Sequence, residues 1–125
     1  MSAGAGRDRG QSSVEVALLL PFVALLLLAV VQVGLVARDQ VLVVHAAREA
    51  ARAAAVDAAD GAARDAAASA TDLSPARFSV EVSGRGEAGT RVEVVVRYRS
   101  ETAVPLVGRL VGDVELTGRA TMRVE

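Results

Sequence analysis

The hydrophobic pattern of this chain begins with one long uninterrupted apolar run. Residues 16–37 carry no charge, and Gln32 is the one strongly polar side chain among them. A helix of 22 residues is about 33 Å long, which is enough to cross the hydrocarbon core of a bilayer. Pro21 falls within the first two turns of this predicted helix, where few backbone hydrogen bonds are lost. The run therefore predicts a transmembrane helix over residues 11–37.

The pattern then becomes alanine-rich without losing its helical character. Residues 38–70 contain no proline and a single glycine, Gly61, so we expect the helix to continue to about residue 70, with Gly34 and Gly61 as the places where it can bend. One face of this continuation is alanine and the other is charged. Two interpretations of the alanine face remain open: it packs against neighbouring subunits, or it docks the chain's own sheet. The alanines recur every fourth residue, at 46, 50, 54, 58, 62, 66 and 70 and at 47, 51, 55, 59, 63 and 67.

Beyond Pro75 the hydrophobic period changes from helical to alternating. Apolar side chains occupy every second position over residues 78–82, 92–98 and 114–124, except at Gly118, and a glycine-rich loop separates the first two runs. Three strands with one apolar face each need a cover, and the alanine-rich helix is the one sizeable candidate. We therefore predict an α+β fold in which a long N-terminal helix packs on a small three-stranded antiparallel sheet over residues 76–125.

Two features of the predicted sheet leave alternatives open. The connection over residues 102–112 is apolar for a loop, which fits a contact surface for partner proteins or lipid headgroups. We favour a flap or short helical turn that closes the sheet's open edge. The outward arginines of the strands form either a basic strip or, as we favour, a solvated face interspersed with glutamates.

Composition and charge argue against a nucleic-acid partner, a metal or cofactor site and a catalytic site. The net charge is −1 and aromatic residues are scarce, so we expect no nucleic-acid partner. Cysteine is absent, and His45 is the single histidine, so we expect no metal, no cofactor and no catalytic residues. The spacing of Gly84, Gly86 and Gly89 matches a dinucleotide-binding motif, but it joins two strands instead of opening a helix. We predict that the protein is not an enzyme.

The residues ahead of the apolar run carry the most specific signal. A short basic leader, residues 1–10, ends in a glycine, and Glu15 stands at the fifth position after it. This arrangement resembles the processing site of type IV prepilins. The resemblance implies that a prepilin peptidase cuts between Gly10 and Gln11, and that Glu15 supports subunit registration in the filament. A local alternative is a capping box, with Ser12 as N-cap and Glu15 reaching back to its amide.

The longer N-terminal segment resembles the TadE family of minor pilins, or pseudopilins, of the tight-adherence pilus system. The resemblance covers about the first 56 residues, although Val16 replaces an aromatic residue common in the family, and Gln32 stands where an acidic residue is frequent. It implies a role in pilus assembly and adhesion, with other pilin subunits and the assembly machinery as partners. The resemblance rests on Gly10, Ser13-Val14-Glu15, residues 17–22, Gln32-Val33-Gly34 and residues 46–52.

The predicted location is the bacterial cytoplasmic membrane and, after assembly, a cell-surface pilus. We expect a single pass with the N-terminus inside and the C-terminal domain outside, because the leader is short and the prepilin resemblance requires this orientation. A cleaved signal peptide is disfavoured by the length of the apolar run and by its poor cleavage site. The alternative function is a permanently anchored extracytoplasmic assembly or binding factor that is neither processed nor polymerised.

Overall fold

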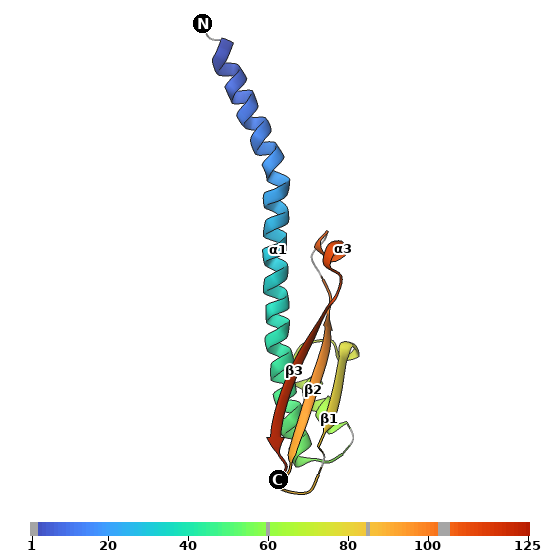
Figure 1. Ribbon diagram of the computed structural model, residues 1–125. Coiled ribbons are helices and arrows are strands. Elements are labelled where there is room, and N and C mark those ends of the chain that lie inside the picture. Colours follow the sequence, from blue (N-terminus) through green and yellow to red (C-terminus); the bar gives the residue numbers. More distant parts are fainter. Residues whose placement is uncertain (1–2, 60, 85, 103–105) are drawn as a thin grey trace.

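The computed structural model describes residues 3–59, 61–84, 86–102 and 106–125, with side chains from residue 9 onward except that of residue 107. The first two leader residues and residues 103–105 of the apolar loop lie outside this description. The fold is α+β, as predicted: a long helix packs against a three-stranded antiparallel sheet (Figure 1). The elements in chain order are α1 (Ala3–Val56), α2 (Ala62–Ser69), the 3-10 turn η1 (Pro75–Arg77), β1 (Phe78–Ser83), β2 (Arg91–Ser100), α3 (Val107–Val111) and β3 (Val114–Arg123).

Helix α1 dominates the molecule, and its N-terminal half extends away from the rest of the fold (Figure 1). It is the one helix in the described part of the chain that is long and apolar enough to cross a membrane, and its most apolar stretch buries nothing within the protein. Because α1 begins at Ala3, Pro21 lies well inside the helix and not in its first two turns as expected. The N-terminal part of α1 is tilted relative to the remainder, as an interior proline favours.

The three predicted strands are confirmed, and they form a sheet in the order β1-β2-β3. In this sheet Val96 at the centre of β2 pairs with Val80 of β1 and Gly118 of β3. The alternating valines of β2 face inward and are fully buried, whereas the outward side chains form salt bridges. Arg97 lies 2.9 Å from Glu81, and Arg119 lies 3.5 Å from Glu93, so the outer face is a solvated, mixed-charge surface as favoured.

The alanine face of α1 docks the chain's own sheet, which decides between the two interpretations left open. Small side chains bury little area each but let the backbones approach closely. The approach is close at Gly118, where an added Cβ would lie 2.7 Å from the carbonyl oxygen of Val43. The core of α1 and α2 consists of Val43, Ala46, Ala47, Ala50, Ala51, Ala54, Ala55, Ala63 and Ala67.

The expectation of one helix continuing to about residue 70 is wrong. α1 ends at Val56, and the Asp57 carboxylate accepts a hydrogen bond of 2.8 Å from the amide of Ala59, which stabilises a turn. Gly61 then adopts a positive φ of 98°, and α2 begins. The chain reverses, so that Asp72, just after α2, lies 2.7 Å from Arg38. Packing of α2 against α1 buries alanines that a continued straight helix would leave exposed.

The apolar connection between β2 and β3 contains the short helix α3, which agrees with the predicted helical turn. It does not close an edge of the sheet, however. The β2–β3 ladder ends at the pair Ser100 and Val114, and α3 lies beyond that end, beside α1 (Figure 1). The side chains of Leu106, Leu110 and Val111 are exposed there.

Candidate assembly segment at the N-terminal end of α1

The two residues of the predicted processing site lie within α1. Gly10 and Gln11 are both helical and exposed, and the helix extends upstream of them to Ala3. A Cβ added at Gly10 would meet no atom within 4 Å, so the glycine is not required by packing. Glycine inside a helix costs about 1 kcal/mol relative to alanine, which makes this position easier to unwind than its neighbours.

The local alternative for Glu15, a capping box, does not agree with the structure. Because α1 starts at Ala3, Ser12 lies in the interior of the helix and cannot be its N-cap. The Ser13 hydroxyl donates to the carbonyl oxygen of Arg9 at 3.0 Å, which is the bond that an interior helical serine makes to the preceding turn. Glu15 is therefore not a capping residue of this helix.

Glu15 stands at the boundary between polar and apolar surface. Its side chain is exposed, and within the described part of the chain no hydrogen bond or ion pair engages its carboxylate. Gln11 precedes it by four residues, so the two side chains lie on the same helical face, one turn apart. The arrangement presents a carboxylate at the edge of an apolar rod, where a cation from elsewhere would be favoured strongly.

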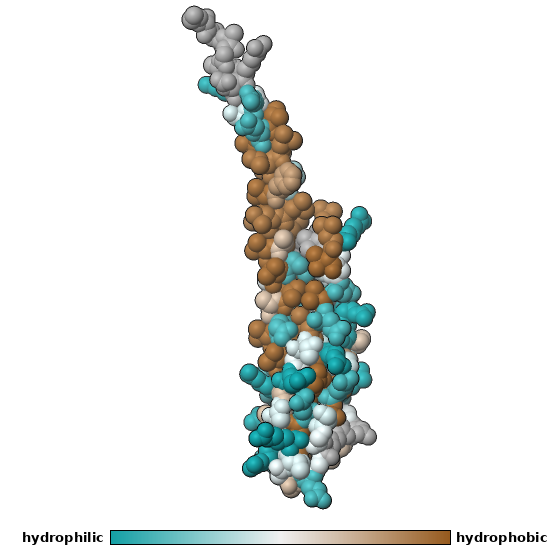
Figure 2. Space-filling model, viewed as in Figure 1, coloured by the Kyte–Doolittle hydropathy of each residue, from teal (hydrophilic) through white to brown (hydrophobic). Residues whose placement is uncertain are grey.

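The apolar surface that begins beside Glu15, at Val14, is almost entirely uncovered. Large side chains project from all sides of α1, and Figure 2 shows a continuous hydrophobic band along this part of the helix. A surface of this size on a protein marks a site for lipid or for other helices. Its exposed large residues are Val14, Val16, Leu18, Leu19, Leu20, Phe22, Val23, Leu25, Leu26, Leu27, Val30, Val31, Val33 and Leu35.

Comparison with known families assigns this segment. Residues 10–52 match the family of TadE-like proteins, and the match begins at Gly10. Over this segment the chain is TadE-like. The TadE-like segment contains Gly10, Gln11 and Glu15, the whole apolar run, and the first part of the alanine face that packs on the sheet. Neither the curated proteins nor the solved structures show a significant match to the chain.

The family match bears on the prediction that the protein is not an enzyme. TadE-like proteins are pilin-type proteins and generally not enzymes. The described residues contain no group of three acidic, histidine or cysteine side chains placed to hold a metal, and His45 is exposed on α1. Gly84 and Gly89 adopt positive φ in the turn between β1 and β2, so these glycines have a conformational role.

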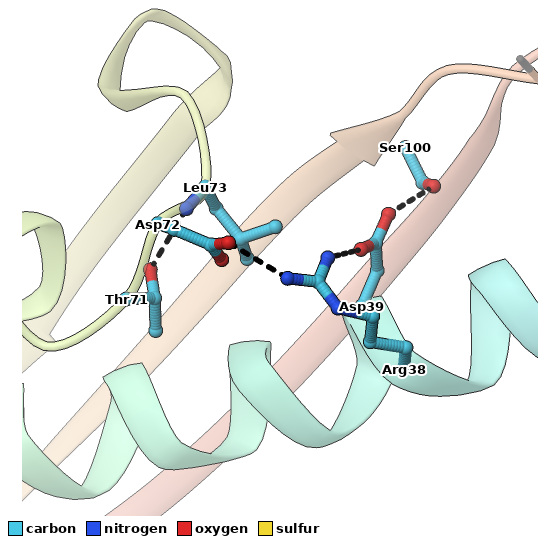
Figure 3. Close-up of polar contacts among 6 residues, drawn as sticks. All are labelled: Arg38, Asp39, Thr71, Asp72, Leu73 and Ser100. Carbon is cyan, nitrogen blue, oxygen red and sulfur yellow. Dashed lines mark hydrogen bonds and ion pairs between the residues drawn. The ribbon is translucent and has the colours of Figure 1, made fainter.

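Sequence reasoning missed a polar junction just below the apolar run. The Ser100 hydroxyl, at the end of β2, donates to the Asp39 carboxylate at 2.7 Å, and Arg38 lies 3.5 Å from Asp39 and 2.7 Å from Asp72 (Figure 3). Ser100 is buried and Asp39 is mostly shielded. The junction joins α1, the turn after α2 and the end of β2. No sequence periodicity pairs residues 39 and 100, so only the tertiary structure reveals it.

Proposed function

We propose that this TadE-like protein is a minor pilin or pseudopilin of a Tad-type pilus. In this proposal a prepilin peptidase cuts between Gly10 and Gln11, and the mature chain acts in pilus assembly and adhesion from the bacterial cytoplasmic membrane. The observation that carries the proposal is the exposed apolar half of α1 with a carboxylate at its edge, Glu15, that pairs with no side chain in the described part of the chain. A soluble monomer gains nothing from such a surface, whereas a subunit stored in lipid and then packed among other helices needs it.

Cleavage would give Glu15 a specific electrostatic partner. It creates an α-amino group at Gln11, with a pKa usually near 8, so the new terminus carries positive charge at neutral pH. An unpaired carboxylate at the lipid edge is costly, and an ammonium from a neighbouring subunit lowers that cost. Pairing between Glu15 of one subunit and the N-terminus of the next would fix their axial stagger.

The first experiment is the intact mass of the membrane-extracted protein in cells with and without an active prepilin peptidase. We expect a chain that begins at Gln11 only where the peptidase is active. Gly10→Ala should remain helical, because the structure leaves room for its Cβ, yet should stay uncut. Gly34→Ala is the matched control, since this glycine also has no neighbour within 4 Å and lies in the same helix.

The second experiment isolates the role of Glu15. Glu15→Gln retains the shape of the side chain but removes its charge, so we expect normal cleavage and membrane insertion with reduced recovery in the sheared pilus fraction. Glu87→Gln, which removes an exposed carboxylate from the β1–β2 loop, is the control. Normal incorporation of Glu15→Gln would contradict the registration role.

A permanently anchored assembly factor is the second candidate, and one observation favours it. The bond between Gly10 and Gln11 lies in regular helix, and a helical peptide bond must unwind before a peptidase can bind it in extended form. If the measured mass corresponds to a chain that begins at residue 1 or 2 whether or not the peptidase is active, this second function replaces the first. A start at Arg38 would instead indicate a signal peptide.

A further inference from the structure

The connection between β2 and β3 reaches far along α1 toward its N-terminus. The hydrogen bond between Ser100 and Asp39 fixes the end of β2 beside residue 39 of α1. Farther toward the N-terminus of α1, Gln32 is only 7% exposed, and α3 contacts α1 beyond the end of the strands. The connection therefore covers α1 at the level of Gln32, about 10 Å beyond Asp39 along the helix axis. This level lies inside the apolar run of residues 16–37.

The end of this connection is unusually hydrophobic. We call residues 106–111 the hairpin tip. Leu106, Leu110 and Val111 are 56%, 83% and 62% exposed, and among the described residues outside α1 they are the only large hydrophobic side chains exposed to this degree. The rest of the sheet domain buries its large apolar residues, so their exposure here is selective. In Figure 2 the hydrophobic patch over α3 lies beside the hydrophobic band of α1.

The hairpin tip is held in place by contacts at its base. The Thr102 hydroxyl donates to the carbonyl oxygen of Gly112, and Arg77 forms an ion pair with Glu101. Leu106 adopts a positive φ of 70°, a conformation that costs free energy for a residue with a large side chain. The exposed leucines thus project from a clamped loop, which makes the patch a defined surface of the fold.

We infer that the hairpin tip embeds in the outer leaflet of the bilayer that α1 spans. The inference rests on the membrane anchoring contained in the proposed function. If residues 16–37 cross the bilayer, then the level of Gln32 lies within its outer leaflet, and lipid that contacts the exposed face of α1 also surrounds the tip. Short apolar helices favour this boundary, where their nonpolar side chains reach about 5 to 10 Å below the headgroups.

Arg109 of the hairpin tip and Gln32 of the neighbouring α1 both fit a lipid environment. Arg109 is exposed on α3, and its long side chain can extend outward to lipid phosphates while the leucines remain among acyl chains. Gln32, on α1 at the level that the connection reaches, is buried, and its Oε1 has no hydrogen-bond partner in the part of the chain that is described. An amide facing acyl chains directly would be costly, so the burial of Gln32 fits a connection that lies against α1 within the bilayer.

Depth-dependent quenching tests this inference on the full chain, which contains no native cysteine. Leu110→Cys, Leu26→Cys and Glu87→Cys are each labelled with an environment-sensitive fluorophore and reconstituted at low protein density in phosphatidylcholine vesicles with brominated acyl chains. We expect the label at 110 to be quenched to nearly the extent seen at 26, in the apolar run. The label at 87, in the β1–β2 loop at the opposite end of the sheet, should be quenched by aqueous iodide instead.

The outcomes separate the hairpin tip from the membrane anchor. Quenching at 26 without quenching at 110 overturns the inference and leaves the span intact. Loss of quenching at 26 overturns the anchoring itself. Protection of 110 from both quenchers also overturns the inference, because it shows a protein cover such as a second copy of the chain.

A second variant tests the energetics of the hairpin tip. Leu110→Asp, read with a label at Val111→Cys, should reduce the population embedded in lipid by about tenfold or more, whereas Leu110→Ala should reduce it much less. Leu110 is 83% exposed, so neither change disturbs the core. Equal quenching in the two variants would contradict the inference.

Discussion

The two halves of α1 belong to one helix but have opposite surfaces. Residues 16–37 carry mostly leucine and valine and are exposed, whereas residues 43–55 are mostly alanine and the face directed at the sheet is buried. Large apolar side chains therefore occur where the chain makes few contacts with itself, and small ones occur where the sheet approaches. Large side chains gain more free energy on transfer to lipid, and alanine permits close packing at the cost of buried area.

This difference shows that one half of α1 buries its apolar face within the protein, whereas the other half leaves its apolar surface exposed. The sheet domain, with α2 and the second half of α1, buries most of its large hydrophobic side chains apart from those of the hairpin tip. The first half of α1 does not, so its stability as an isolated rod depends on the surrounding medium. Four substitutions can break or sharpen this contrast, and Tyr98 provides the readout, because it is the only tyrosine, it is buried, and no tryptophan is present.

The largest effect is expected from a charge in the exposed half. Leu26→Arg should disfavour membrane insertion by about 3 to 4 kcal/mol, because arginine at the centre of a spanning helix is costly and a leucine is lost. Alkaline extraction of membranes measures this change, with Leu26→Ala as control. The unfolding midpoint of the detergent-solubilised variant, followed by Tyr98 fluorescence, should not move. A lowered midpoint would show that the two halves are coupled energetically.

The second effect concerns the close approach of α1 and β3 at Gly118 in the packed half. Gly118→Ala places a methyl group 2.7 Å from the Val43 carbonyl oxygen, so α1 and β3 must separate, at a cost of about 2 to 3 kcal/mol in unfolding free energy. Chemical denaturation followed by Tyr98 fluorescence measures it. Gly34→Ala, with open space around its Cβ, should leave this transition unchanged. Equal stability of both variants would show that the helix and strand can relax without loss.

The third effect lies at the junction between the halves. Ser100→Ala removes the hydroxyl that donates to Asp39 and should lower the unfolding free energy by about 1 to 2 kcal/mol, because the shielded carboxylate loses a partner. Ser83→Ala is a matched control, since its exposed hydroxyl makes a long 3.5 Å bond to the Glu93 carbonyl oxygen. If both serine variants denature alike, the junction contributes no more than an exposed contact.

The smallest effect is expected on the outer face of the sheet. Glu81→Gln removes the ion pair with Arg97, and exposed pairs of this kind contribute about 0.2 to 1 kcal/mol. The loss in unfolding free energy should be measurable at low ionic strength and should vanish near 1 M salt, where charges are screened. A difference that persists at high salt would show that the pair acts through packing.

The local periodicity of the sequence predicts the helix, the three strands and the cover of the sheet. Alternation at Val92, Val94 and Val96 and the alanine rows of α1 are repeated signals, and each repeat supports the same conclusion. The candidate assembly segment is likewise local, since Gly10 and Glu15 lie five residues apart. These features could be predicted because each depends on residues that are close together in the sequence, where a repeated pattern can be recognised.

Features set by single contacts could not be predicted in this way. The reversal after Val56 depends on one Asp57 side chain and one glycine conformation, where helical propensity alone favours continuation. The hydrogen bond between Ser100 and Asp39 joins residues 61 positions apart, and no repeated sequence pattern indicates it. The missing side chain at Gly118 appears in the pattern only as a gap in an apolar face, and the close approach of α1 explains it.

The proline inside α1 has a mechanical consequence. Pro21 removes one backbone hydrogen bond and crowds the preceding turn, so α1 yields there more easily than along the length that follows. The helix therefore consists of two segments: a short one before Pro21, which carries Gly10 and Glu15, and a longer one after Pro21, which is packed on the sheet at its C-terminal end. We expect a force perpendicular to the helix axis on the first segment to bend α1 at Pro21 without twisting the sheet. We expect a force along the helix axis, in contrast, to be transmitted through the second segment to β2 and β3, which pack against it.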